Sequence, residues 1–166
     1  ASRMAWTHLP TAVKDGSDIE ARSQMLLASA MAAVAFNVVG AGARHVRGHP
    51  IDARRQPAHG QTRATMLPHV MRFNSESRAT KYAEIAAAIG VANPGASDAV
   101  NAKSCIEAVE VLVERLGLRK GLGDLGASKN DVAQLVEDAL QDLTMRTNPR
   151  KVTADDARAM FEAALA

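Results

Sequence analysis

Aromatic side chains make up only 3% of the 166 residues, and β-branched runs bounded by turn residues are scarce. Because β-strands draw on those residue types, their shortage argues against a sheet-based domain. Alanine, leucine, valine and methionine are abundant instead and bring the hydrophobic share to 47%. This composition favours helix, and it is sufficient for the core of a single globular domain.

The sequence also has a single cysteine and no long apolar run. The one cysteine, Cys105, excludes an internal disulfide framework and predicts a reducing compartment, by default the cytoplasm. The longest apolar stretch, Met25–Gly40, is interrupted by Ser29 and Asn37 and is shorter than the roughly 20 residues that span a bilayer. We therefore expect a buried helix at the centre of the domain, and no membrane partner.

Charge of either sign is nearly balanced, with a formal net charge of +2. Five arginines nevertheless cluster around the single acid Asp52: Arg44, Arg47, Arg54, Arg55 and Arg63. They form either a solvated basic rim or part of a pocket for an anionic substrate or the phosphates of a cofactor. A helical nucleic-acid-binding module is the rival interpretation, but no aromatic platform accompanies the arginines, so we expect no nucleic-acid partner.

Turn residues and apolar periodicity divide the chain into helices. A short first helix is expected to stop at Pro10, and Ser97 and the Thr153/Asp156 capping box are expected to begin later ones. The predicted helical segments are Met4–Leu9, Ile19–Val39, Gly60–Phe73, Ser77–Ile89, a segment after Ser97 that buries Cys105, Asp131–Leu143 and a last helix after Thr153. The sequence thus predicts an all-α, multi-helix bundle-like domain without a convincing strand.

Three of the five histidines, His45, His49 and His59, fall within fifteen residues. On a helix His45 and His49 would project from one face, and His59 could fold back towards them after the turn at Pro57. Imidazoles of this kind suit ferrous iron or zinc. The alternative is three polar loop histidines, each bonded to backbone. The glutamate of a His-Glu-x-x-His metalloprotease is missing, so peptide hydrolysis is not expected.

A glycine-rich segment, Gly121-Leu-Gly123-Asp-Leu-Gly126, matches the letters of a dinucleotide-binding fingerprint. It follows an amphipathic helix rather than a strand, so the βαβ context of that fingerprint is missing. We expect a loop between helices.

Several motifs together resemble the iron-containing (group III) alcohol dehydrogenase family over essentially the whole chain. They are Ala35-Phe36-Asn37, His45-x3-His49-Pro50, His59-Gly60, Met66-Leu67-Pro68-His69-Val70-Met71-Arg72-Phe73-Asn74, Asp124-Leu125-Gly126 and Asn148-Pro149-Arg150. The resemblance implies the C-terminal half of a dehydroquinate synthase-like fold, and an enzyme that transfers hydride between a small alcohol and its aldehyde or ketone.

The resemblance also implies roles for individual residues. His45 and His59 match two of the family's metal ligands, for Fe²⁺ with Zn²⁺ as the alternative. His49 matches a histidine beside the nicotinamide that could relay the proton of the alcohol. Phe36 matches an aromatic residue that lines the pocket near the nicotinamide, so Phe36 and His49 are the cofactor-binding candidates.

Two parts of the family pattern are missing from residues 1–166, which we interpret as a single helical domain. The remaining ligands form an Asp-x3-His motif that this sequence lacks. The N-terminal domain that would bind most of the NAD or NADP is also absent. The isolated chain is therefore expected to be inactive, and family analogy implies that the longer enzyme is a homo-oligomer.

Two alternatives to the alcohol dehydrogenase remain open. A maleylacetate reductase-like enzyme shares the fold, and His59-Gly60-Gln61-Thr62 resembles its sequence. Such reductases generally function without the metal. A non-enzymatic helical interaction module is the alternative from a different class.

Overall fold

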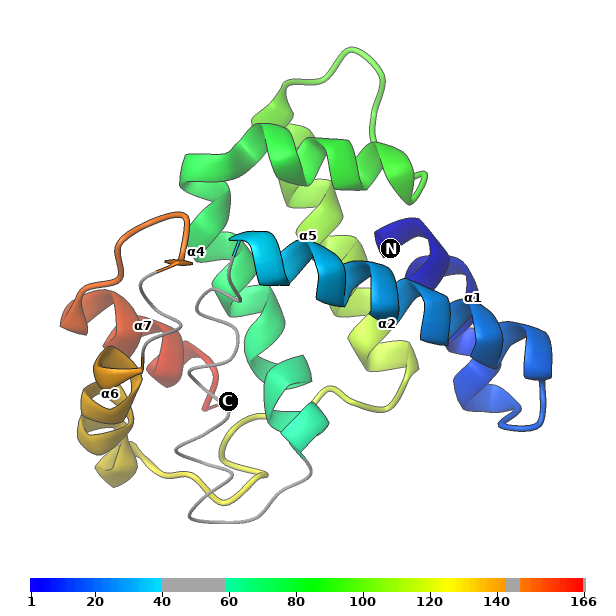
Figure 1. Ribbon diagram of the computed structural model, residues 1–166. Helices are drawn as coiled ribbons and strands as arrows, with labels where there is room; N and C mark the ends of the chain where they lie inside the picture. Colours follow the sequence, from blue (N-terminus) through cyan, green and yellow to red (C-terminus); the bar gives the residue numbers. More distant parts are fainter. Residues whose placement is uncertain (40–58, 143–146, 166) are drawn as a thin grey trace.

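A computed structural model describes residues 1–39, 59–142 and 147–165, and every regular element in those ranges is helical. Figure 1 shows three groups of helices, with a central pair flanked by one pair on either side. The all-α prediction is confirmed. None of the described helices is long and apolar enough to cross a membrane.

The central pair consists of α4 (His59–Ala88) and α5 (Asp98–Arg115), which pack along each other. Gly60–Phe73 and Ser77–Ile89 were expected to be separate helices, and α4 does consist of two helical parts that meet at a kink. The change of direction is a kink at Arg78, whose backbone (φ −137°, ψ 33°) is not helical. The predicted division into two helices is therefore confirmed, with the boundary at Arg78, a few residues later than the sequence placed it.

Two cores lie on different faces of α4. Met66, Val70 and Phe73 pack towards α6 (Val132–Gln141) and α7 (Ala154–Ala163), where Phe161 is fully buried. Met71 packs in a second cluster with Cys105 and Ile106 of α5 and Ala86 of α4. This confirms the buried stripe predicted around Cys105. Because α4 contributes residues to both cores, it is the central helix of the described chain.

The start signals of the later helices are also confirmed. Ser97 caps α5 by accepting a hydrogen bond from the Val100 amide at 3.4 Å. At α7 the Asp156 carboxylate accepts from the Thr153 amide, and the Thr153 hydroxyl accepts from the Asp156 amide, which forms the predicted capping box. A short 3-10 turn, η1 (Lys129–Asp131), precedes α6.

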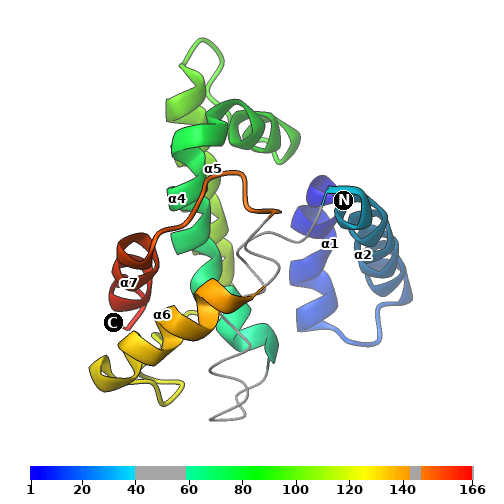
Figure 2. The ribbon, with the colours of Figure 1, turned by 60° about the vertical axis from the view of Figure 1, so that its left-hand side comes forward.

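Two expectations for the first helices are wrong. α1 (Ser2–Lys14) continues through Pro10 instead of stopping there, because packing against α2 (Ile19–Val39) outweighs the backbone hydrogen bond that a proline cannot donate. Moreover, α2 is not a buried central helix: it lies on the outside of the molecule, to one side of α4 and α5 (Figures 1 and 2). The sequence showed that α2 is apolar, but not what covers it.

Candidate metal and nicotinamide site

The predicted site residues lie at the edges of what the structure describes. His45 and His49 lie outside the described residues. Phe36 belongs to the last turns of α2 and His59 is the first residue of α4, and for both only the helical backbone is described. The ligand and cofactor roles of these four residues therefore stay predictions.

The first turns of α4 carry an unusual concentration of buried polar side chains. Thr62 is fully buried and Thr65 nearly so. Gln61 donates from Nε2 to the carbonyl of Leu118, just beyond α5, at 2.7 Å, and Thr65 donates to the Gln61 carbonyl at 3.1 Å. Buried polar groups are costly unless they are hydrogen-bonded. The helix turn that begins at His59 is consequently tied to the end of α5.

The arginine cluster reaches the described part of the chain at one residue. Arg63 lies half-buried on the second turn of α4, with its Nε atom shielded from solvent. The other four arginines lie outside the described residues. Arg63 is therefore not part of a fully solvated basic rim.

Within residues 1–39, 59–142 and 147–165, no group of three or more His, Cys, Asp and Glu side chains could hold a metal ion. The predicted ligands His45 and His59 were not part of that set, because their side chains lie outside the described residues. Their chemistry fits a borderline divalent cation, because neutral imidazole is a common ligand of iron and zinc. Two imidazoles fill about half of a four-ligand shell.

A reciprocal amide pair joins α4 to the turn before α7. Asn74, which is 5% exposed, donates to Asn148 Oδ1 at 3.1 Å, and Asn148 donates back to Asn74 Oδ1 at 2.8 Å. The same Asn148 amide nitrogen also donates to the Arg150 carbonyl at 2.6 Å, which closes the Asn148-Pro149-Arg150 turn. Both residues belong to motifs that carry the family resemblance. Their contact across 74 positions has no local sequence signal.

Arg150 extends this link with its charge. Its guanidinium lies 4.1 Å from the centre of the Phe73 ring and pairs with Glu76 at 2.5 Å. A longer approach of 3.9 Å brings it to Asp156 of the α7 capping box. One cation therefore contacts an aromatic face on α4, an acid on α4 and the first turn of α7.

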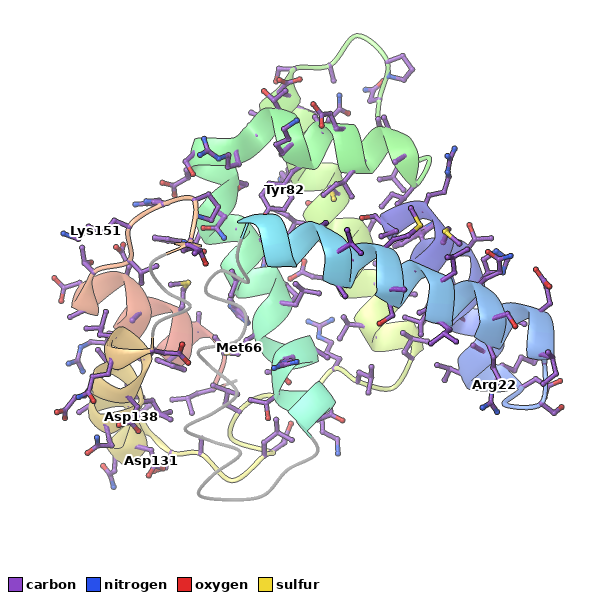
Figure 3. The ribbon with its side chains drawn as sticks, in the orientation of Figure 1. Arg22, Met66, Tyr82, Asp131, Asp138 and Lys151 are labelled. Carbon is purple, nitrogen blue, oxygen red and sulfur yellow. The ribbon has the colours of Figure 1, made fainter. Side chains whose placement is uncertain are left out.

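Two ionisable groups lie between α4 and α5, the partly buried Tyr82 and the buried Cys105, and both have ordinary structural explanations. Burial raises the pKa of Tyr82, against the opposing effect of its hydrogen bond with Asn74. Burial also raises the pKa of the fully buried Cys105 thiol. Figure 3 shows Tyr82 in the upper half of the central pair, and Met66 further down α4. A thiol with a raised pKa is a poor nucleophile at neutral pH, so Cys105 is a core residue, as predicted.

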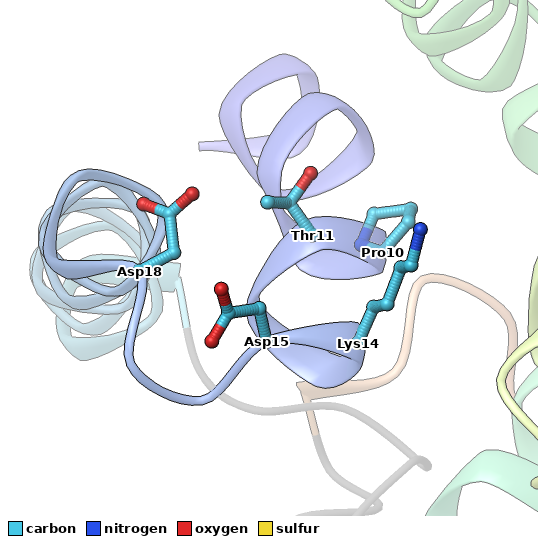
Figure 4. A pocket seen from close by; sticks show the side chains of 5 residues that line it. All are labelled: Pro10, Thr11, Lys14, Asp15 and Asp18. Atoms are coloured by element: carbon cyan, nitrogen blue, oxygen red, sulfur yellow. The ribbon is translucent and has the colours of Figure 1, made fainter.

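A surface hollow at the turn between α1 and α2 is lined by Pro10, Thr11, Lys14, Asp15 and Asp18 (Figure 4). Its two carboxylates serve the turn itself. Asp15 accepts from the Ser17 hydroxyl and amide, which lowers its pKa, and Asp18 accepts from the Ala21 amide at the start of α2. The acids are therefore turn and capping groups, and the hollow is separate from the predicted histidines in the sequence.

The glycine-rich segment is a loop between helices, as predicted. Its backbone is hydrogen-bonded to the residues that follow α7, beside the core shared by α4, α6 and α7. The Leu122 amide donates to the Ala164 carbonyl at 2.6 Å, and the Gly123 amide donates to the Leu165 carbonyl at 3.3 Å. Leu122 itself is fully buried. The loop thus fixes the residues that follow α7, and it has no phosphate-binding context.

Comparison with known proteins shows which family has this sequence and fold. Residues 1–165 match the profile of the Fe-containing alcohol dehydrogenase family, C-terminal. The chain belongs to the iron-containing alcohol dehydrogenase family. The resemblance carried by the sequence motifs is confirmed.

Individual members of the iron-containing alcohol dehydrogenase family are similar along the whole chain. The NAD-dependent methanol dehydrogenase of Bacillus methanolicus is 33% identical over 99% of this chain and 43% of its own length. A crystal structure of 1,3-propanediol oxidoreductase superposes with a TM-score of 0.95 at 34% identity, and the alcohol dehydrogenase of Oenococcus oeni with 0.94 at 30%. Each superposition covers 98% of this chain and 43% of the other. The chain spans less than half the length of these relatives.

Proposed function

We propose that the chain is the helical half of a metal-dependent, NAD(P)-linked alcohol dehydrogenase and supplies two of the metal ligands, His45 and His59. The observation that carries the proposal is the family match over residues 1–165. The cluster of His45, His49 and His59 supports it, because the motif resemblance implies that His45 and His59 are metal ligands. The substrate would be a small alcohol and its aldehyde or ketone. NAD-dependent methanol dehydrogenase and 1,3-propanediol oxidoreductase are named for alcohols of this size.

The roles of the side chains follow from their chemistry. When bound, a ferrous or zinc ion supplies Lewis acidity at the substrate oxygen. His45 and His59 hold the ion with neutral imidazoles and leave its charge uncancelled. His49, whose type of side chain titrates near neutrality, accepts the alcohol proton and passes it towards solvent. Phe36 offers an apolar surface to the nicotinamide. The other two ligands and most of the cofactor site come from residues beyond this chain.

The ligand assignment is tested by elemental analysis of the longer protein that contains this chain. Wild-type protein should retain about one iron or zinc ion per chain, as a single four-ligand site does. His45→Ala and His59→Ala should each lose most of it. His8→Ala, a half-buried histidine on α1 outside the cluster, is the matched control and should retain the wild-type content.

The same measurement separates the proposal from its enzyme rival. Wild-type content in both ligand variants would show that the ligand assignment is wrong. A wild-type protein that carries no metal but still transfers hydride would favour the maleylacetate reductase-like alternative. The upstream reading frame provides an independent check, because the proposal requires an Asp-x3-His motif there.

A further inference from the structure

The first turn of α4, which begins at the predicted metal ligand His59, is weak by its own sequence. Its second residue is Gly60, and a glycine lowers helix stability by about 1 kcal/mol relative to alanine. No acidic residue lies in this turn to complement the helix dipole. The amides of a first turn also have no acceptor within the helix. Contacts with other elements must therefore hold the turn in place.

Gln61 provides such a contact. Its Nε2 atom donates to the Leu118 carbonyl oxygen at 2.7 Å, in a partly buried setting. The Gln61 carbonyl in turn accepts a hydrogen bond from the Thr65 hydroxyl at 3.1 Å. Figure 1 shows the lower end of α4 beside the yellow segment that follows α5. Two residues after His59, therefore, both the side chain and the backbone carbonyl of Gln61 are held by side-chain hydrogen bonds.

The acceptor of this bond belongs to a rigid part of the chain. α5 ends in a Schellman motif, in which the Leu118 amide donates to the Val113 carbonyl at 3.0 Å and the Gly117 amide donates to the Glu114 carbonyl at 2.9 Å. Gly117 has a φ of 68°, the left-handed backbone that this motif requires. Leu118 is thus fixed to α5, and its bond with Gln61 fixes the first turn of α4 relative to α5.

Gln61 is not itself placed as a ligand. Residues two apart on a helix are about 200° apart around its axis, so positions 59 and 61 lie on different sides of α4. Amide oxygens also suit harder cations than iron or zinc. The contribution of Gln61 is therefore to the position of the turn. Groups that orient a ligating histidine typically change metal affinity by about 10–100-fold.

We propose that Gln61 is a positioning residue for the metal site, because its hydrogen bond to the Leu118 carbonyl holds the backbone of His59 where the imidazole can bind the ion. The inference rests on the proposed function, since it takes His59 as a ligand. It goes beyond the proposed function by making metal retention depend on the end of α5.

Metal retention in the complete gene product tests this role. The protein is loaded with Co²⁺, whose visible absorption reports its coordination, and the loss of the ion to excess EDTA is timed. Gln61→Met keeps the length of the side chain and removes the donor. This variant should lose Co²⁺ about tenfold or more faster than wild type, with a changed cobalt spectrum. Gln24→Met is the matched control and should behave as wild type, because Gln24 bonds to Glu20 within α2.

A pair of glycine variants tests the same link from the side of the acceptor. Gly117→Ala strains the motif that holds Leu118, although nothing lies within 4 Å of its Cβ position. It should also speed the loss of Co²⁺. Gly95→Ala introduces the same kind of strain at a φ of 87° before the start of α5, again with nothing within 4 Å. It should leave the rate unchanged.

Two results would overturn the positioning role. The first is a rate of cobalt loss and a cobalt spectrum in Gln61→Met that equal those of wild type. The second is equally fast loss from Gly95→Ala and Gly117→Ala, because the effect would then reflect stability alone. Failure of the proposed function is distinguishable: His59→Ala would retain Co²⁺ with the wild-type spectrum, and the inference would fall with it. If His59→Ala loses the ion while Gln61→Met behaves as wild type, only the positioning role is wrong.

Discussion

The Asn74–Asn148 amide pair gives the clearest test at the scale of single residues. Asn148→Ala should lower the free energy of unfolding by about 1–3 kcal/mol, since the buried Asn74 amide on α4 loses both hydrogen bonds to Asn148 and the 148–150 turn loses its closing bond. Urea unfolding measures the change. Asn130→Ala, at an exposed position in η1, should stay within about 0.5 kcal/mol of wild type.

A double variant decides whether the two amides act as a pair. If Asn74→Ala and Asn148→Ala are coupled, the double variant should lose clearly less than the sum of the single losses. Simple additivity would show that each asparagine stabilises its own segment, and that the contact between α4 and the turn contributes little.

Gly123 is a second residue whose identity the structure explains. A Cβ atom at this position would lie 2.9 Å from the backbone carbonyl oxygen of Leu165, which cannot move aside as a flexible side chain could. Gly123→Ala should therefore destabilise the chain by about 1–3 kcal/mol in thermal or urea unfolding. Gly16→Ala is the matched control, because nothing lies within 4 Å of its Cβ position. Equal stability of both variants would contradict the described loop contact.

At the scale of elements, the α7 capping box should make stability depend on pH. Hydrogen bonds from the Thr153 amide and hydroxyl, the amide first, lower the pKa of Asp156 below its ordinary value of 3.8. Because the folded-state pKa is the lower one, the stabilisation is present above pH 3.8 and is lost as the pH falls through the folded value. Asp156→Asn should thus be less stable than wild type at pH 6, and the difference should shrink below about pH 4.

The control for this prediction lies in the same turn. Asp155→Asn removes an acid from the first turn of α7 without touching the capping box. Its difference from wild type reflects the helix dipole, worth about 0.3–1 kcal/mol at an exposed site. If the two variants responded identically to pH, the hydrogen bonds of Thr153 would not be the cause.

Elements were predictable from the sequence where their signals are local. Ser97 and the Thr153/Asp156 box fix helix starts through contacts three residues apart, and both predictions are confirmed. The prediction at Pro10 failed because packing overrides local preference, and α1 continues through its proline against α2. Propensity is a weak guide where tertiary contacts compensate for it.

For the whole molecule, periodicity identifies apolar faces but not their partners. The sequence of α2 favoured a central helix, and the structure places it outside, because apolar character is equally compatible with a cover from the same domain or from elsewhere. The site shows the same division. Family motifs predict site roles for His45, His49, His59 and Phe36, and these roles stay predictions. The Gln61–Leu118 link, which joins α4 to the segment after α5, has no sequence signal.

The proposed division of the site between this chain and the rest of a longer enzyme leads to a prediction for the chain by itself. Purified residues 1–166 should show no turnover of NAD or NADP with small alcohols, and they should bind Fe²⁺ or Zn²⁺ more weakly than the longer protein does. Two imidazoles fill only half of a four-ligand shell, and the chain contains no Asp-x3-His motif to complete it. The assays are nicotinamide absorbance and metal titration on both proteins under identical conditions. Turnover by the short chain without a partner would contradict the division of the site between two halves. Metal binding of equal strength in both proteins would instead show that residues 1–166 complete the coordination shell themselves.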